Sequence, residues 1–195
     1  GPTAPLVPPP STETAVAPEL DVRALRRRFE ELARSKKPPA ELRVALEQLL
    51  LVARDSQLRA LIESELRRAR THEALERVAV ASDLDLAAAL VAARKAAGDD
   101  PALGREIDLA RGSRLLLQGR FADALDALES PAREESPLGR DARRSRGFAL
   151  EKLGRLADAL ASYASAEDDT ACGYAARAAM KRLEGELSSA DLNAQ

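Results

Sequence analysis

The sequence contains very few aromatic residues and only one cysteine. Its 195 residues include no Trp, two Tyr, three Phe and a single Cys, Cys172. One cysteine excludes an intrachain disulfide and a cysteine-based zinc site, and we expect Cys172 to be a small buried residue at the start of the last helix. Without large rings the core must be filled by Leu and Ala, which favours helices that approach one another closely.

The sequence also lacks a charge imbalance and a long hydrophobic run. It has 30 basic and 32 acidic residues, so its net charge of -2 gives no general attraction to nucleic acids or membranes. No run of about eighteen apolar residues occurs, which excludes a transmembrane helix in this sequence. Gly1-Pro2 resembles a protease-cleavage scar, and the abundance of Arg and Ala is typical of GC-rich bacteria. We therefore expect a soluble fragment of a larger bacterial protein, either cytoplasmic or periplasmic.

Residues suited to catalysis or metal binding are scarce. His72 is the only histidine, and no Ser or Cys is patterned near it as a catalytic partner. Adjacent carboxylates such as Glu30-Glu31 diverge by about 100° around a helix, so they do not form an acid–base pair. Neither a phosphate-binding Gly-Lys-Ser/Thr motif nor a Gly-x-Ser-x-Gly motif is present. We therefore expect no enzyme, no cofactor and no metal site.

The pattern of apolar residues predicts an all-α protein of about ten short helices. Apolar side chains recur every three or four positions, and no alternating β pattern competes with them. Asp55 and Asp83 are expected to cap two of the helices. The expected helices are 19–35, 39–53, 56–69, 71–81, 84–97, two pairs between 101 and 170, and 171–187.

The two ends of the chain are expected to lie outside the folded body. Residues 1–18 contain six prolines, which predicts a flexible linker. Pro5-Leu6-Val7-Pro8 also fits the P-x-x-P pattern of a polyproline ligand, although a spacer is favoured. Residues 188–195 are predicted to be a frayed tail.

An internal repeat with a period of thirty-five residues is the most informative feature present. Residues 111–125 and 146–160 both contain Arg-Gly, then Gly-Arg, an apolar residue and Ala-Asp-Ala-Leu at matching positions. A fixed period of this size is typical of stacked helical hairpins. Gly119 and Gly154 are expected to end the first helix of each hairpin with a positive φ. The small residues expected where the two helices cross are Gly112, Ala124, Gly147 and Ala159.

This pattern resembles the tetratricopeptide repeat (TPR) family. The resemblance is strongest over 105–170 and weaker over 70–104. It implies a TPR-like helical-hairpin solenoid, with repeats and a C-terminal capping helix over 70–187. Residues 19–69 are either divergent repeats or a separate helical cap. The sequence departs from the family where the first helix usually carries Trp and Leu, because it has Asp108, Arg111, Arg143 and Arg146 there.

The resemblance also implies a binding groove lined by the first helix of each repeat. The asparagine, lysine and arginine set with which some family members hold a peptide carboxylate is missing here. The implied lining is more apolar, so either it holds an apolar peptide or helix of a partner, or other helices of this chain cover it. The partner-binding residues implied by the register are Leu109, Ser113, Leu116, Leu117, Arg144, Phe148, Glu151 and Lys152, preceded in the earliest unit by Ala74 and Val78.

We therefore expect a non-catalytic module for protein–protein interaction, acting as an adaptor or in assembly. A first alternative is a structural domain that forms homo-oligomers by pairing 19–69 between chains. A second alternative is nucleic-acid binding by the basic first helix, although the balanced charge and missing aromatics argue against it. The basic residues of this helix and the turn after it are Arg23, Arg26, Arg27, Arg28, Arg34, Lys36 and Lys37.

Overall fold

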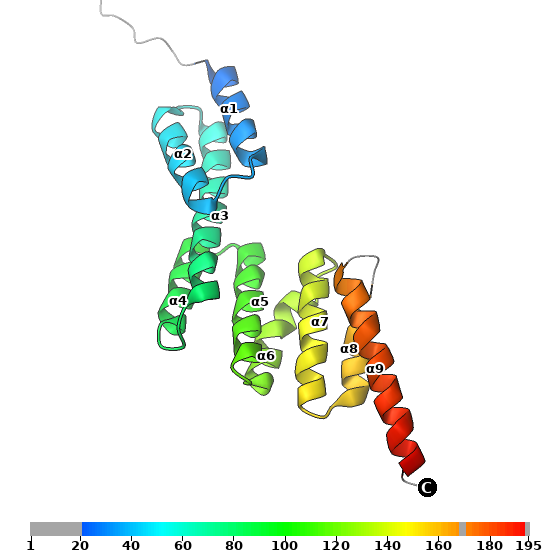
Figure 1. The fold of residues 1–195 in the computed structure, drawn as a ribbon. Helices are drawn as coiled ribbons and strands as arrows, with labels where there is room; N and C mark the ends of the chain where they lie inside the picture. Colours follow the sequence, from blue (N-terminus) through cyan, green and yellow to red (C-terminus); the bar gives the residue numbers. More distant parts are fainter. Residues whose placement is uncertain (1–20, 168–170, 194–195) are drawn as a thin grey trace, which may run out of the picture.

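The computed structural model describes residues 21–167 and 171–193, which fold into nine helices without any strand (Figure 1). This confirms an all-α fold. The expected linker, 1–18, and residues 194–195 lie outside the described part. The helices are α1 (Val22–Arg34), α2 (Pro39–Val52), α3 (Ser56–Val80), α4 (Leu86–Ala97), α5 (Pro101–Leu117), α6 (Phe121–Ala132), α7 (Pro137–Lys152), α8 (Leu156–Ala164) and α9 (Ala171–Asn193).

Helices that are neighbours in the sequence pack against each other as sequential pairs. The most extensive pairs are α2 with α3, α3 with α4, α5 with α6, α6 with α7 and α7 with α8. Alternate helices also touch, since α3 contacts α5, α5 contacts α7 and α7 contacts α9. The helices are consequently laid out in chain order, from α1 at one end of the molecule to α9 at the other (Figure 1).

Among the described residues, the buried core is divided into four clusters that succeed one another along the chain. The first cluster spans 32–69, the second 74–107, the third 115–142 and the fourth 150–183. Ala69 belongs to the first cluster and Ala74 to the second, so α3 joins the two. Each cluster consists mainly of Leu and Ala, as the scarcity of aromatic side chains predicts.

Two successive hairpins, α5–α6 and α7–α8, turn on glycines in the same conformation. Gly119 has a φ of 72° and Gly154 a φ of 74°, which confirms the expected left-handed geometry. The N–H of Arg155 donates to the carbonyl of Leu150 at 2.9 Å, and that of Gly154 donates to Glu151 at 3.0 Å. This pair of bonds is a Schellman motif, and it recurs at Gly119.

Small residues allow the helices of both hairpins to approach closely. A Cβ added at Gly112 would lie 2.6 Å from the Leu128 side chain, and one at Gly147 would lie 2.7 Å from the Tyr163 ring. Ala159 is fully buried, as is its counterpart Ala124. The expected crossing positions are thus confirmed in both hairpins.

Residues 56–80 form one long helix rather than the two that the sequence analysis predicted. No Gly or Pro interrupts them. Thr71, the expected start of a separate helix, is buried, and its Oγ1 donates to the Arg67 carbonyl at 2.9 Å. A threonine bonded to the preceding turn continues a helix instead of capping one. The prediction of ten helices was therefore one too many for the described part of the chain.

Two predicted helix ends also differ from the structure. Asp83 does not cap α4, which begins at Leu86 after a turn in which Ser82 Oγ bonds Asp85 at 2.6 Å. Asp83 instead accepts a hydrogen bond from Gln118 at 2.6 Å. At the other end of the molecule, α9 continues past the predicted end at Leu187.

Candidate functional site

The eight predicted groove residues lie on two neighbouring helices, α5 and α7, which run side by side in Figure 1. Four of them are exposed and four are half-buried. The exposed residues are Ser113, Leu117, Phe148 and Lys152, and the half-buried ones are Leu109, Leu116, Arg144 and Glu151.

Leu117 and Phe148 place apolar surface on this face. Leu117, at the end of α5, is 79% exposed, and Phe148 on α7 is 40% exposed. The edge of the Phe148 ring meets Phe121, with ring centroids 6.3 Å apart and planes at 75°. Phe121 begins α6 directly after the turn that follows Leu117. Its contact with Phe148 therefore connects the end of α5 to α7. Sequence reasoning missed this contact, since only the tertiary arrangement brings the rings together.

Lys152 adds a positive charge beside the aromatic pair. Its ammonium group lies 5.3 Å from the centroid of the Phe148 ring, within the range of a cation–π interaction. Lys152 is exposed, and no ion pair to it is recorded within the described part of the chain. Its charge therefore remains available to an acidic group on a partner.

Glu151 is occupied by contacts inside the molecule. Its carboxylate accepts a hydrogen bond from the Tyr163 hydroxyl at 3.2 Å and pairs with Arg182 of α9 at 2.6 Å. Burial raises the pKa of the Tyr163 hydroxyl above its usual range, and the charge of Glu151 raises it further. Tyr163 thus stays protonated and donates to Glu151. This carboxylate joins α7, α8 and α9 and is not a free contact for a partner.

The remaining predicted residues combine packing with partial exposure. Leu109 and Leu116 pack against the third core cluster. Ser113 Oγ donates to the carbonyl of Leu109 at 2.9 Å, so its hydroxyl is used within α5. Arg144 has a buried Nε that has no hydrogen-bond partner among the described residues. The exposed apolar residues among the eight are therefore Leu117 and Phe148.

The predicted groove does not extend to α3. Ala74 and Val78 were expected to line it, but both are buried in the second core cluster, which includes residues of α3, α4 and α5. These two positions follow the alternative that helices of the same chain cover the face, because this face of α3 packs against its neighbours. The candidate site is limited to α5, α7 and the start of α6.

The titratable His72 lies on α3, outside this site. His72 Nε2 lies 2.8 Å from Glu106, and this hydrogen bond lowers the pKa of that carboxyl below its usual value. In the described ranges, no three His, Cys, Asp or Glu side chains gather as metal ligands. The side chain of Cys172 is not among those described. No helix within the described part is long and apolar enough to span a bilayer.

The basic first helix presents its charges to solvent. Arg23, Arg26, Arg27 and Arg28 are exposed. Arg28 pairs with Glu31 one turn away, as Arg34 does with Glu30. Such i,i+3 and i,i+4 pairs are typical of a solvated helix surface.

No family model matches the chain, and no curated protein or solved structure was found to be similar to it.

Proposed function

We propose that this chain is a non-catalytic protein-interaction module, a TPR-like helical-hairpin solenoid that uses the exposed face of α5 and α7. The observation that carries the proposal is the apolar surface of Leu117 and Phe148, exposed on two neighbouring helices. Apolar surface that gathers on one face of a protein is typical of a site that binds another protein.

The repeat geometry supports the comparison with TPR proteins. Two glycines thirty-five residues apart share the same φ and the same pair of turn hydrogen bonds. In each hairpin a glycine of the first helix touches a large side chain of the second. In TPR proteins the first helices of successive repeats line the groove, which corresponds here to α5 and α7.

The chemistry of the face favours a partner segment with apolar and acidic residues. Leu117 and Phe148 offer apolar contacts, while Lys152 and Arg144 add positive charge at the same face. Glu151 does not offset them, because Arg182 neutralises it. An amphipathic helix with acidic flanks would match both features.

The test is binding of a peptide selected by display from a library of acidic amphipathic helices. We expect Leu117→Asp to weaken binding about tenfold or more, because it places a charge in the apolar centre of the interface. Leu117 is a better probe than the half-buried Leu116, where an Asp would also disturb the core. Fluorescence anisotropy with a labelled peptide measures the affinity, and circular dichroism checks helix content.

The matched control is Leu51→Asp, since Leu51 is 85% exposed and lies on α2, which among the described helices contacts α1 and α3 but not α5 or α7. It should leave peptide binding unchanged. A charge reversal, Lys152→Glu, should mainly slow association and reduce its dependence on salt. Equal binding by the wild-type protein and Leu117→Asp, with both folded, would rule out this face.

Self-association through α1–α3 is a second candidate, and a separate set of exposed side chains favours it. Several large apolar residues of these helices face solvent, which suits pairing between two chains. They are Val22, Val44, Leu51, Val52 and Leu61. Analytical ultracentrifugation separates the candidates: a dimer dissociated by Leu51→Asp supports self-association, whereas a monomer at all concentrations excludes it.

A further inference from the structure

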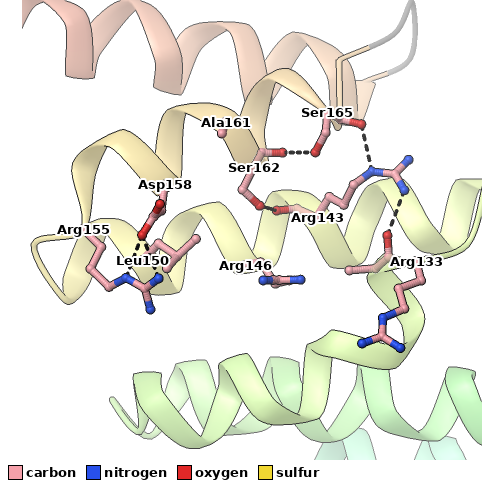
Figure 2. Close-up of a pocket in the computed structure, with 10 residues that line it drawn as sticks. Arg133, Arg143, Arg146, Leu150, Arg155, Asp158, Ala161, Ser162 and Ser165 are labelled. Atoms are coloured by element: carbon pink, nitrogen blue, oxygen red, sulfur yellow. Dashed lines mark hydrogen bonds and ion pairs between the residues drawn. The ribbon is translucent and has the colours of Figure 1, made fainter.

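A pocket of about 310 Å³ opens between the end of α6, α7 and α8, and arginines dominate its lining (Figure 2). The charged side chains around it are Arg133, Arg143, Arg146, Arg155 and Asp158. Successive helix residues turn by about 100°, so Arg143 and Arg146 lie on roughly the opposite side of α7 from Phe148. The pocket is therefore separate from the α5–α7 face.

Two of the four arginines have their charge balanced by a carboxylate. Arg155 pairs with Asp158 at 2.7 Å, and Arg133 pairs with Glu129. Both pairs are exposed, and each joins residues three or four positions apart. A bound anion can therefore accept hydrogen bonds from the guanidinium N–H groups that the carboxylates leave free. These two arginines form the rim of the pocket.

Arg143 is held in place by carbonyl groups alone. Its Nε donates to the Ser165 carbonyl at 2.8 Å (Figure 2). Its Nη1 donates to the carbonyls of Ala132 and Glu134 at 2.9 Å each. The carbonyls lie at the ends of α6 and α8. They fix the guanidinium geometry but leave its positive charge without a carboxylate within the described part of the chain.

Arg146 has no recorded partner within the described part of the chain. Its Nε is shielded from solvent and makes no hydrogen bond to the residues that the structure describes. An arginine offers five N–H donors in a planar fork, and leaving a buried donor unsatisfied is unfavourable. Arg146 therefore provides an unused donor set in the lining of the pocket.

The preceding hairpin shows that packing does not require this excess of arginine. Thirty-five residues before Arg143 stands Asp108, which pairs with Arg94. The counterpart of Ala161, a pocket residue, is Asp126. At these two equivalent positions the α5–α6 hairpin thus has carboxylates, whereas the α7–α8 hairpin has an arginine and an alanine.

We propose that the pocket between α6, α7 and α8 binds a phosphate group, with Arg146 and Arg143 as its central ligands. A phosphate with two negative charges balances the two guanidinium groups that have no carboxylate, whereas a single carboxylate balances one. The free guanidinium fork of Arg146 matches phosphate oxygens in geometry, and Arg143 adds its remaining Nη2 donor. The phosphate comes either from a small phosphorylated molecule or from a phosphorylated side chain of a protein.

Isothermal titration calorimetry tests the proposal with inorganic phosphate, pyrophosphate, a glycine-rich peptide carrying one phosphoserine, and the same peptide unphosphorylated. We expect saturable binding of at least one phosphate-bearing probe and none of the unphosphorylated peptide. Affinity for the phosphopeptide should fall below about pH 6, where its phosphate takes up a proton while arginine stays charged. Binding of inorganic phosphate or pyrophosphate points to a small ligand, and binding of the phosphopeptide alone points to a protein.

Arg146→Gln is the decisive variant, and Arg111→Gln is its matched control. Arg111 occupies the equivalent position thirty-five residues earlier and is exposed. Arg146→Gln should weaken phosphate binding about tenfold or more, while Arg111→Gln should have little effect. Arg146→Lys keeps the charge without the fork and should give an intermediate affinity. Phosphate should raise the melting temperature of the wild-type protein but not of Arg146→Gln.

Three results would overturn the proposal. They are the absence of saturable binding by every phosphate probe, equal binding of the phosphorylated and unphosphorylated peptides, and equal losses in Arg146→Gln and Arg111→Gln. The outcome is independent of the α5–α7 face, because Leu117→Asp should leave phosphate binding unchanged.

Discussion

In each of the two hairpins, a glycine with a positive φ marks the end of the first helix. At Gly154 a φ of 74° reverses the chain, and the backbone N–H groups of Gly154 and Arg155 satisfy carbonyls of the last helical turn. The sequence reveals this residue because glycine is the type that adopts a positive φ at little cost. Its recurrence thirty-five residues from Gly119 identifies the turn without any tertiary information.

Replacing Gly154 by alanine should destabilise the protein, whereas the same change at Gly185 should stabilise it. No atom lies within 4 Å of a Cβ added at either position, so space does not distinguish them. Alanine at Gly154 must adopt the left-handed conformation, at a cost of about 1–2 kcal/mol. At Gly185, inside α9, it gains about 0.5–1 kcal/mol of helix propensity. Urea unfolding measures the change in the free energy of unfolding for both variants, and equal changes would contradict the prediction.

Other residues of the candidate site depend on contacts between distant parts of the chain. Repeat register alone placed Glu151 in the groove, yet Arg182, thirty-one residues later, binds its carboxylate. Register likewise places Ala74 and Val78 at groove-facing positions, and in the structure other helices cover them. Periodicity predicts which residues share a helix face, but it does not tell what covers that face.

Whole helices were predictable where a strong local signal marks their ends. Pro101 and Pro137 stand at the first position of their helices, and Asp100 and Ser136 cap the same two helices. α3 lacks any such signal between its two halves, and the prediction divided it at Thr71. Threonine is a favoured residue at helix N-termini. In the structure its hydroxyl instead donates to a carbonyl of the preceding turn, and no local sequence pattern distinguishes these two roles.

The crossing of α7 and α8 should not tolerate a larger side chain at Ala159. This residue is fully buried, and Gly147 and Tyr163 pack beside it in the same hairpin. Ala159→Leu should therefore reduce the free energy of unfolding by about 1–3 kcal/mol through overpacking. Ala157→Leu on the exposed side of α8 is the control and should change stability little. Thermal unfolding followed by circular dichroism compares them, and equal midpoints would remove Ala159 from the crossing.

At the scale of the whole molecule, the core consists of successive clusters rather than one centre. Each cluster draws on helices that are close in sequence, so most packing is local along the chain. The repeat predicts this arrangement for the later hairpins. It does not predict that a continuous α3 joins the first two clusters. The local pattern indicates a helix break at Thr71, which the structure does not have.

This division of the core predicts that damage at one end stays at that end. Leu46 lies in the first cluster and Leu183 in the fourth, and both are fully buried. Replacing either by alanine removes apolar contacts worth about 2–5 kcal/mol. Hydrogen exchange followed by mass spectrometry should show faster exchange in α2 and α3 for Leu46→Ala, with α7–α9 unchanged, and the reverse for Leu183→Ala. Local opening requires only the contacts of the affected cluster to break. Faster exchange across all helices in both variants would instead mean that the clusters unfold as a single cooperative unit.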